Sequence, residues 1–284
     1  PMRIDPIVPR PRRATLVAAA ADFTGQVDWT HAAEGVEWES LAEATSGTWP
    51  RSTDGTVSKT EARRVNGASA LATGSALPFT VYGHDGADFD VSDAERWERY
   101  ARAVLAAALP DRIEEVFWTG NVRGAAYQTG ITDLGAGQIL SGSGTNDIVP
   151  TLWALLDQIR ITSGVKGTLT IHSPEAAFAA AKNLNLIERE NTPAGPVWMF
   201  NEHQWVFGAG YTNVGPAATA ATSGNVWLAV TGPVEVAVNP TVRIASFTAS
   251  RLNRVRVLAE QDAFARVDTA PIWCAEAVLP QSAA

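Results

Sequence analysis

Four histidines are the side chains best suited to acid–base or metal chemistry, and they lie in four separate segments: His31, His84, His172 and His203. None has a second histidine or a cysteine at the spacing that zinc sites use. An acidic run also invites a calcium interpretation, but its spacing differs from that of an EF-hand loop. That run holds Asp85, Asp88, Asp90 and Asp93. We therefore expect no metal and no cofactor.

Two of the histidines have neighbours that could serve hydrolysis. His172 is followed by Ser173 and Glu175, and Glu202 precedes His203. A cap at a strand–helix junction explains the first group more simply than a catalytic site does. The Gly-rich segments GAGQ and SGSGT lack the Gly-Lys-Ser/Thr end of a phosphate-binding loop and the spacing of a nucleophile elbow. The sequence predicts that the protein is not an enzyme.

Bulk composition excludes other classes. The chain has 284 residues, with 22 basic and 30 acidic side chains and a formal charge of −8, which argues against a protein that coats nucleic acid. No apolar run approaches the ~18 residues that span a bilayer, and the short LVAAAA stretch makes a poor secretion signal. Cys274 is the only cysteine, so no intrachain disulfide exists and we expect synthesis in a reducing cytoplasm.

The elements that must position any site are organised around one long helix, expected over 92–118. Trp97, Ala101, Val104, Leu105 and Ala108 form an apolar stripe at three- and four-residue steps. A capping box at the start predicts where the helix begins. Pro110 is expected to end or kink the helix before a second helical segment, which Gly120 stops.

Later segments alternate helix and strand. A helix over 151–160, the strand GTLTIHS, the helix PEAAFAAAKNL and the strands VWMF, QWVF and NVWLAV predict a mixed α/β subdomain of roughly 90 residues. The final segment 251–279 predicts a long antiparallel ribbon packed along the opening helix. One domain would then combine early and late chain, with the α/β part inserted.

The first 45 or so residues do not suggest a compact core. Four prolines and an Arg cluster predict an arm, although a frayed terminus is the simpler interpretation. Trp29, Trp38 and Trp49 need a surface to bury against, either in the same chain or in a neighbouring subunit. Segment 51–78, with Asp54-Gly55 and Asn66-Gly67 turns, predicts a polar two-stranded excursion that is marginal alone.

These features together resemble a known family. The Pro/Arg arm, the polar hairpin, a long helix ending in EEVFWTGN, the segments GTLTIHSPEAAFAAAKN and VFGAGYTNVGP, and a closing FARVDTAPIWCAEAVL are similar to major capsid proteins of tailed bacteriophages with the Hong Kong 97-like fold. Within that family, the chain most resembles capsid proteins of phages that infect actinobacteria. The likeness covers nearly the whole chain, and in the arm and hairpin it rests on order alone.

The resemblance implies an α+β fold with five parts. They are an N-arm at 1–47, an extended E-loop hairpin at 48–80, a peripheral domain at 81–150 with its spine helix at 92–118, an inserted α/β axial domain at 151–240, and a peripheral β-ribbon at 241–284.

It also implies a function in assembly. Copies of the chain would form pentamers and hexamers that close into an icosahedral virion shell around double-stranded DNA, assembled in the host bacterial cytoplasm. Implied partners are a portal protein, a scaffolding protein or segment, a protease and a decoration protein. The DNA would be contacted weakly and without sequence specificity, which suits an acidic chain. No membrane is involved.

Six residues are candidate contacts between subunits: Trp29, Trp38, Trp49, Lys59, Arg63 and Arg64. Some relatives join subunits by a Lys-Asn isopeptide bond, for which Lys59 is the only hairpin lysine and Asn253 one conceivable acceptor, but no motif here secures it. Two alternatives stay open. One is an encapsulin-type bacterial compartment shell of the same fold, and the other is a soluble α/β hydrolase that uses His172 or His203.

Overall fold

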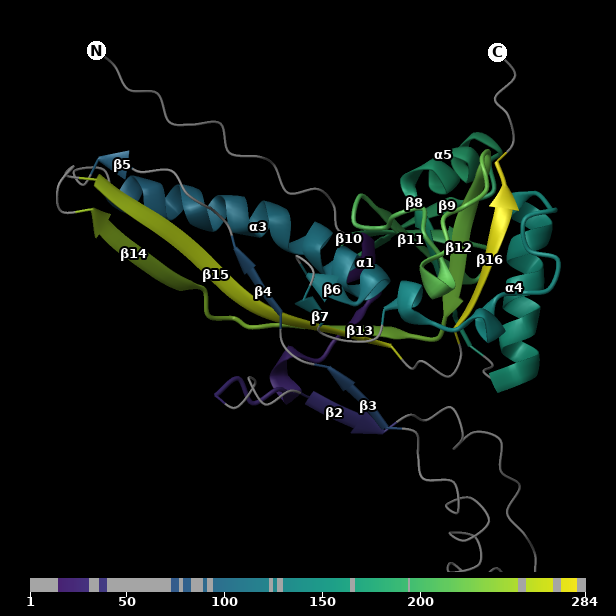
Figure 1. The fold of residues 1–284 in the computed structure, drawn as a ribbon, viewed down its shortest axis with the longest axis horizontal. Helices are drawn as coiled ribbons and strands as arrows, with labels where there is room; N and C mark the ends of the chain where they lie inside the picture. The colour runs from purple at the N-terminus through teal and green to yellow at the C-terminus, as the bar shows by residue number, and fades with distance from the viewer. Residues whose placement is uncertain are drawn as a thin grey trace, which may run out of the picture.

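The computed structural model describes residues 15–30, 36–39, 73–76, 79–82, 89–90, 94–122, 125–126, 130–163, 167–193, 195–249, 254–267 and 272–279. Within them, two six-stranded sheets dominate, and two short strand pairs accompany them. Figure 1 shows a long ribbon on one side, with helix α3 along it, and a more compact α/β part on the other.

The first large sheet, here called the ribbon sheet, is built on the 14-residue strand β15 (Arg254–Val267). β13 (Val234–Val238) and β14 (Arg243–Ala249) pair with it antiparallel, one after the other. β4 (Phe79–Tyr82) and β5 (Phe89–Asp90) also pair with β15. The two-residue β1 (Ala21–Asp22) pairs parallel with β13 and so completes this sheet.

The second, here called the α/β sheet, has the strand order β16-β12-β8-β11-β10-β9. Its members are β8 (Thr170–Pro174), β9 (Glu188–Thr192), β10 (Gly195–Phe200), β11 (His203–Gly208), β12 (Asn225–Thr231) and β16 (Trp273–Val278). Helices α4 (Ile148–Ser163) and α5 (Glu175–Asn183) pack on one face through a core of Leu, Ile, Phe and Trp side chains. These elements confirm the predicted helix–strand alternation, because each apolar period predicts its element locally.

Helix α3 (Ala94–Thr119) joins the two sheets. Ala101 and Leu105 from its first half and Ile113, Val116 and Phe117 from its second half belong to one core cluster that also holds side chains of both sheets. Of the two predicted effects of Pro110, an end of the helix is wrong: Pro110 lies inside α3, and both halves bury their apolar stripe in that same core. The stop at Gly120 is confirmed: its φ is +68°, which suits glycine, and its N–H donates to Val116 O at 2.8 Å. The predicted cap at Ser92 lies outside the described residues.

The remaining elements are short. They comprise α1 (Thr15–Ala19), η1 (Thr24–Gln26), β2 (Val36–Glu39), β3 (Thr73–Ala76), β6 (Asn121–Val122), β7 (Ala125–Ala126), η4 (Ile131–Asp133), η5 (Ala136–Gln138) and η6 (Pro216–Ala218). β2 pairs with β3, and β6 with β7, both antiparallel.

The last strand corrects the sequence prediction that all of 241–284 belongs to the ribbon. β16 pairs with β12 in the α/β sheet, so only β14 and β15 of that segment lie in the ribbon sheet. The reason is burial on both faces: Ala275 and Ala277 pack under α4 and α5, while Cys274 faces the core around α3. Conversely, β13 falls inside the predicted axial range 151–240, yet it pairs in the ribbon sheet.

A second correction concerns the N-terminal segment. Residues 15–30, here called the strap, lie on the body of their own chain. Leu16 is fully buried in the core around α3, and Phe23 is buried beside Phe264 on the ribbon sheet. The expectation that the first 45 or so residues take no part in a compact core is therefore wrong for the strap, because its few large apolar side chains pack on the body of the chain.

Candidate assembly surfaces

Of the six predicted contact residues, the structure describes the side chain of Trp29 alone. Its indole is part-buried, lies 5.5 Å from the Phe264 ring and donates a hydrogen bond from Nε1 to Thr24 O at 3.2 Å. Trp38 lies in β2, opposite Gly74 of β3. Trp49, Lys59, Arg63 and Arg64 lie outside the described residues, as does Asn253. A contact between subunits stays a prediction for all six, and Trp29 already has a place in its own chain.

His172 lies in the interior and not in a cleft. It is fully buried, stacks on Phe117 at 4.7 Å and contacts Tyr211 and Thr231. Thr231 Oγ1 donates its single proton to Gly232 O at 2.8 Å, so it must accept from His172 Nε2–H at 2.9 Å. His172 Nδ1 then accepts from the Tyr211 hydroxyl at 3.3 Å. Every polar atom of this group is used inside the fold.

The electrostatics of that cluster agree with a structural role. Burial lowers the pKa of His172 to about 3, so the imidazole is neutral at physiological pH. Burial, and secondarily the charge of Glu114, raises the pKa of Tyr211 well above its usual range, so its hydroxyl stays protonated and can donate. His172 on β8 stacks on Phe117 of α3 and bonds to Thr231 of β12. The arrangement therefore ties these three elements together.

His203 is also fully buried and serves the backbone. Its Nδ1 accepts the Leu169 N–H at 3.1 Å, which places the proton on Nε2. Nε2 lies 3.2 Å from Arg160 Nη2 and 3.7 Å from Glu202 Oε1. Burial and the Arg160 charge lower the pKa of His203, and Glu202 opposes them. The sequence pairing of Glu202 with His203 thus marks a turn held against α4, where Arg160 binds Glu202 at 2.6 Å.

No other chemistry emerges from the described residues. No three His, Cys, Asp or Glu side chains among them come together as metal ligands do. Nor does a helix in that part combine the length and apolar character of a membrane span. Cys274 is buried, and burial raises the pKa of its thiol.

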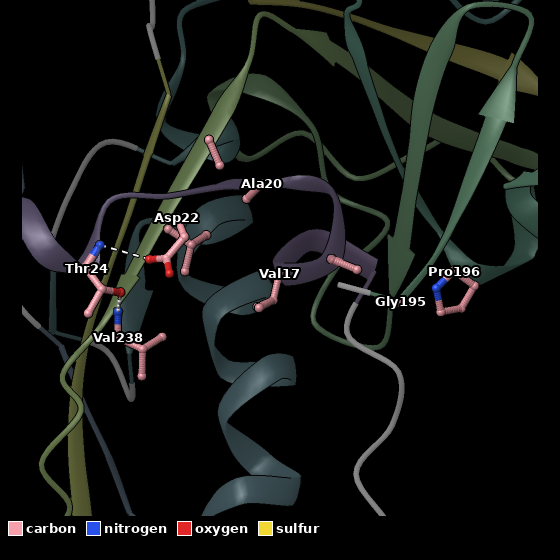
Figure 2. A pocket seen from close by; sticks show the side chains of 10 residues that line it. Val17, Ala20, Asp22, Thr24, Gly195, Pro196 and Val238 are labelled. Atoms are coloured by element: carbon pink, nitrogen blue, oxygen red, sulfur yellow. Dashed lines mark hydrogen bonds between the residues drawn. The ribbon is translucent and has the colours of Figure 1, made fainter. Parts of the chain in front are cut away.

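One groove opens between the strap and both sheets (Figure 2). Its volume is about 640 Å³, and small apolar side chains line most of it. Val17 and Ala20 come from the strap, Gly195 and Pro196 from the start of β10, and Val238 from β13. At its polar end, Asp22 Oδ1 accepts the Thr24 N–H at 2.9 Å, and Thr24 Oγ1 accepts the Val238 N–H at 3.1 Å. The strap therefore fastens to the ribbon sheet beside an open apolar hollow.

Large apolar side chains also reach the surface elsewhere. Trp153 and Ile161 on α4 are 40% and 79% exposed, and Leu184 after α5 is 48% exposed. Trp153 packs partly against Phe200 at 5.4 Å. Single exposed apolar residues are common on protein surfaces, so these three residues do not indicate a particular ligand.

Comparisons with known proteins give matches in structure and none in sequence. No protein-family model matches the chain, and no curated protein matches it. Solved structures do match. The holo-SrpI encapsulin complex from Synechococcus elongatus has a TM-score of 0.57 at 11% identity, covering 100% of this chain and 95% of that one. The capsid of Ralstonia phage GP4 gives 0.53 at 10%, covering 94% and 90%, and Mycobacterium phage Ogopogo gives 0.51 at 14%, covering 98% and 96%.

The chain has the Hong Kong 97-like capsid fold. The α+β class expected from the sequence is thereby confirmed. At 10–14% identity, the likeness concerns the course of the backbone and not particular side chains. Within this capsid fold, sequence reasoning missed the strap and the pairing of β16. The spacing of Leu16, Phe23 and Trp29 was the available signal for the strap.

Proposed function

We propose that this protein is the major capsid protein of a tailed bacteriophage, copies of which assemble as pentamers and hexamers into an icosahedral shell around double-stranded DNA. The observation that carries the proposal is coverage. The capsid fold accounts for nearly the whole chain from end to end, and in each of the three structures compared it also accounts for at least 90% of the other chain.

The placement of chemistry-bearing residues supports an assembly role over a hydrolytic one. His172 and His203 are both buried and occupied by hydrogen bonds inside the chain. We therefore infer that the protein is not an enzyme, and that its work is done by surfaces that meet other copies.

The five-part division by residue number belongs to this proposal, with three revisions, one of which is that β13, inside the axial range, pairs in the ribbon sheet. The N-arm (1–47) contains the strap, which docks on its own chain, and the β-ribbon (241–284) gives up β16 to the axial part. The E-loop (48–80), the peripheral domain (81–150) and the axial domain (151–240) otherwise keep their predicted order. Trp29, Trp38, Trp49, Lys59, Arg63 and Arg64 remain our candidates for contacts between subunits.

The partners follow from the shell. We propose a portal protein, a scaffolding component or protease, and a decoration protein as partners, with the shell assembled in the host cytoplasm and retained in the virion. DNA would be contacted weakly and without sequence specificity. The weak contact follows from the net charge of −8, which disfavours binding of phosphates. A particular likeness to capsid proteins of phages that infect actinobacteria is part of the proposal, and the match to a Mycobacterium phage supports it.

An encapsulin-type compartment is the second candidate, because the encapsulin complex gives a TM-score of 0.57. Purified particles distinguish the two. Electron microscopy and sedimentation should show closed shells of megadalton size, and particles from an infected host should hold double-stranded DNA. Particles that hold a protein cargo and no DNA would favour the compartment. A small soluble oligomer would refute both.

A further inference from the structure

The two sheets end in strands whose outer edges are treated differently. A strand edge exposes unpaired N–H and C=O groups, so a protein must cover it, charge it or use it. In the α/β sheet the terminal strands are β16 and β9. In the ribbon sheet, the edge made by β13 and β14 runs along one border of β15 (Figure 1).

Two of these edges are covered by the chain itself. Leu140 N–H donates to Cys274 O at 2.8 Å and Gly144 N–H to Glu276 O at 2.9 Å, so the loop before α4 covers the edge of β16. The strap does the same for β13, where β1 pairs with Glu235 and Val236.

The edge of β9 is protected by charge. Glu188, Arg189 and Glu190 are all exposed on this five-residue strand. If β9 paired antiparallel with itself about its centre, Glu190 would lie directly opposite Glu190 of the second copy. Like charges in that position are destabilising.

In the part of the chain that the structure describes, the edge of β14 has neither cover nor such charges. Among the described residues no strand pairs with its outer side. Its sequence, RIASFTA, holds one charge, at the first position, and no proline. That charge is already engaged, because Arg243 binds Asp262 through both Nη1 and Nη2, at 2.6 and 2.9 Å. The six uncharged residues that follow Arg243 on this edge are a template for another strand.

We infer that β14 pairs antiparallel with β14 of a second copy across a two-fold axis centred on Ser246. This deepens the proposed shell function by naming one contact between subunits. In that register Arg243 lies opposite Ala249 of the second copy, and no like charges face one another. The two ribbon sheets become one continuous sheet with both α3 helices on the same face, since a two-fold axis perpendicular to a sheet preserves its faces.

A disulfide tests the register directly. Residues directly opposite in antiparallel strands have Cα atoms about 4.5–5.5 Å apart, which lies within disulfide range. Ser246→Cys should therefore give chains that run as covalent dimers on non-reducing denaturing electrophoresis after mild oxidation. Glu190→Cys, at the centre of β9, is the matched control and should stay monomeric. The native Cys274 is buried and should not interfere.

Charge complementation tests whether the contact is with the same residue of another copy. Ser246→Lys and Ser246→Glu should each weaken assembly when alone, and mixing the two purified proteins should restore it. A neighbour that used a different segment on this edge could not produce rescue by mixing. Circular dichroism of each variant checks that the fold is retained, and Ser246→Cys, a small change, gives an answer even if the charged variants unfold.

The outcomes separate this inference from the shell proposal. Particles without Ser246→Cys dimers, or without rescue on mixing, overturn the β14 pairing and leave the shell intact. Dimers through position 246 with no particle under any condition support the pairing and refute the shell. A chain that stays monomeric in both experiments refutes both.

Discussion

The α/β sheet and the ribbon sheet have differently built interiors. The α/β core is filled by bulky side chains, among them Leu152, Leu155, Ile171 and Trp205, all at most 1% exposed. Where α3 meets the ribbon, the buried positions that β15 contributes to that core are alanines: Ala259, Ala263 and Ala265. A bulky core stabilises by area removed from water, whereas an alanine interface lets a helix and a sheet approach closely.

The difference teaches where each region obtains its stability. β8 and β12 are buried along their whole length, with helices on one face and the core around α3 on the other. The ribbon sheet meets α3 through small side chains of β15, and its other face packs against the strap at Phe264. We therefore expect large-to-small changes to harm the α/β part most, and small-to-large changes to harm the ribbon.

The largest expected effect is Trp205→Ala. Trp205 is 1% exposed, packs near Phe200 at 6.1 Å and donates from Nε1 to Ser173 Oγ at 2.8 Å. Its loss should lower the free energy of unfolding by about 3–5 kcal/mol through the cavity it leaves. Trp153→Ala, on the exposed face of α4, is the control and should cost much less. Urea unfolding of both measures the contrast, and equal losses would contradict the picture of a bulky core.

Acid should act where the two regions join, through His172. Its pKa in the fold is about 3, against about 6.5 in an unfolded chain, so the unfolded state binds the extra proton as pH falls. The contribution of neutral His172 to the free energy of unfolding is fully present above about pH 6.5. It is lost between about pH 6.5 and pH 3, at about 1.4 kcal/mol per pH unit.

Unfolding curves between pH 7.5 and pH 4.5 measure this slope. His172→Gln should lower the free energy of unfolding at neutral pH. It should also reduce the dependence of that free energy on pH by the amount that uptake of one proton causes, about 1.4 kcal/mol per pH unit. His203, whose pKa is also lowered, should contribute in the same direction, so His203→Gln is a parallel measurement. An unchanged slope in both variants would mean that neither histidine is neutral and buried in solution.

Overpacking of the ribbon is the next effect. Ala263 is fully buried between α3 and its neighbours, so Ala263→Leu should cost about 1–3 kcal/mol. Ala176→Leu, on the exposed face of α5, adds the same atoms without a clash. Thermal unfolding compares the two. A ribbon that accepted leucine at 263 without loss would show that α3 does not lie close to β15.

The same contrast explains how much the sequence could predict. The stripe of Ala101, Leu105 and Ala108 predicted a helix over 92–118, and α3 runs over Ala94–Thr119, because a helical period is a local property. The prediction failed where strands meet across long separations. Trp273–Val278 is largely apolar and would suit either sheet. No local pattern tells whether its partner is β15 or the distant β12.

For the candidate site too, features that depend on contacts between distant residues could not be predicted from the sequence. The helix cap predicted at His172 and Ser173 is wrong, because Pro174 caps α5 without a side-chain bond; His172 instead bonds to Tyr211 and Thr231, which lie 39 and 59 residues away. The place of β14 at the edge of the described strands could not be predicted from RIASFTA, because an edge is defined by the neighbours that a strand has in the folded sheet. The strap was missed since Leu16 and Phe23 are too few to form a period.

The smallest expected effect lies in the loop that joins β11 to β12. Ala217 and Ala218 have φ values of +54° and +51°, a left-handed conformation that costs an L-residue roughly 1–2 kcal/mol and glycine almost nothing. The chain holds this turn because Ala217 N–H donates to Leu134 O at 2.8 Å. Ala217→Gly should therefore stabilise the protein by up to about 1 kcal/mol, after the greater freedom of glycine in the unfolded chain is subtracted. Ala220→Gly, in the same exposed loop and without a positive φ, is the matched control and should destabilise slightly. Thermal unfolding of the pair gives the sign, and destabilisation of the same size in both variants would show that the left-handed turn does not persist in solution.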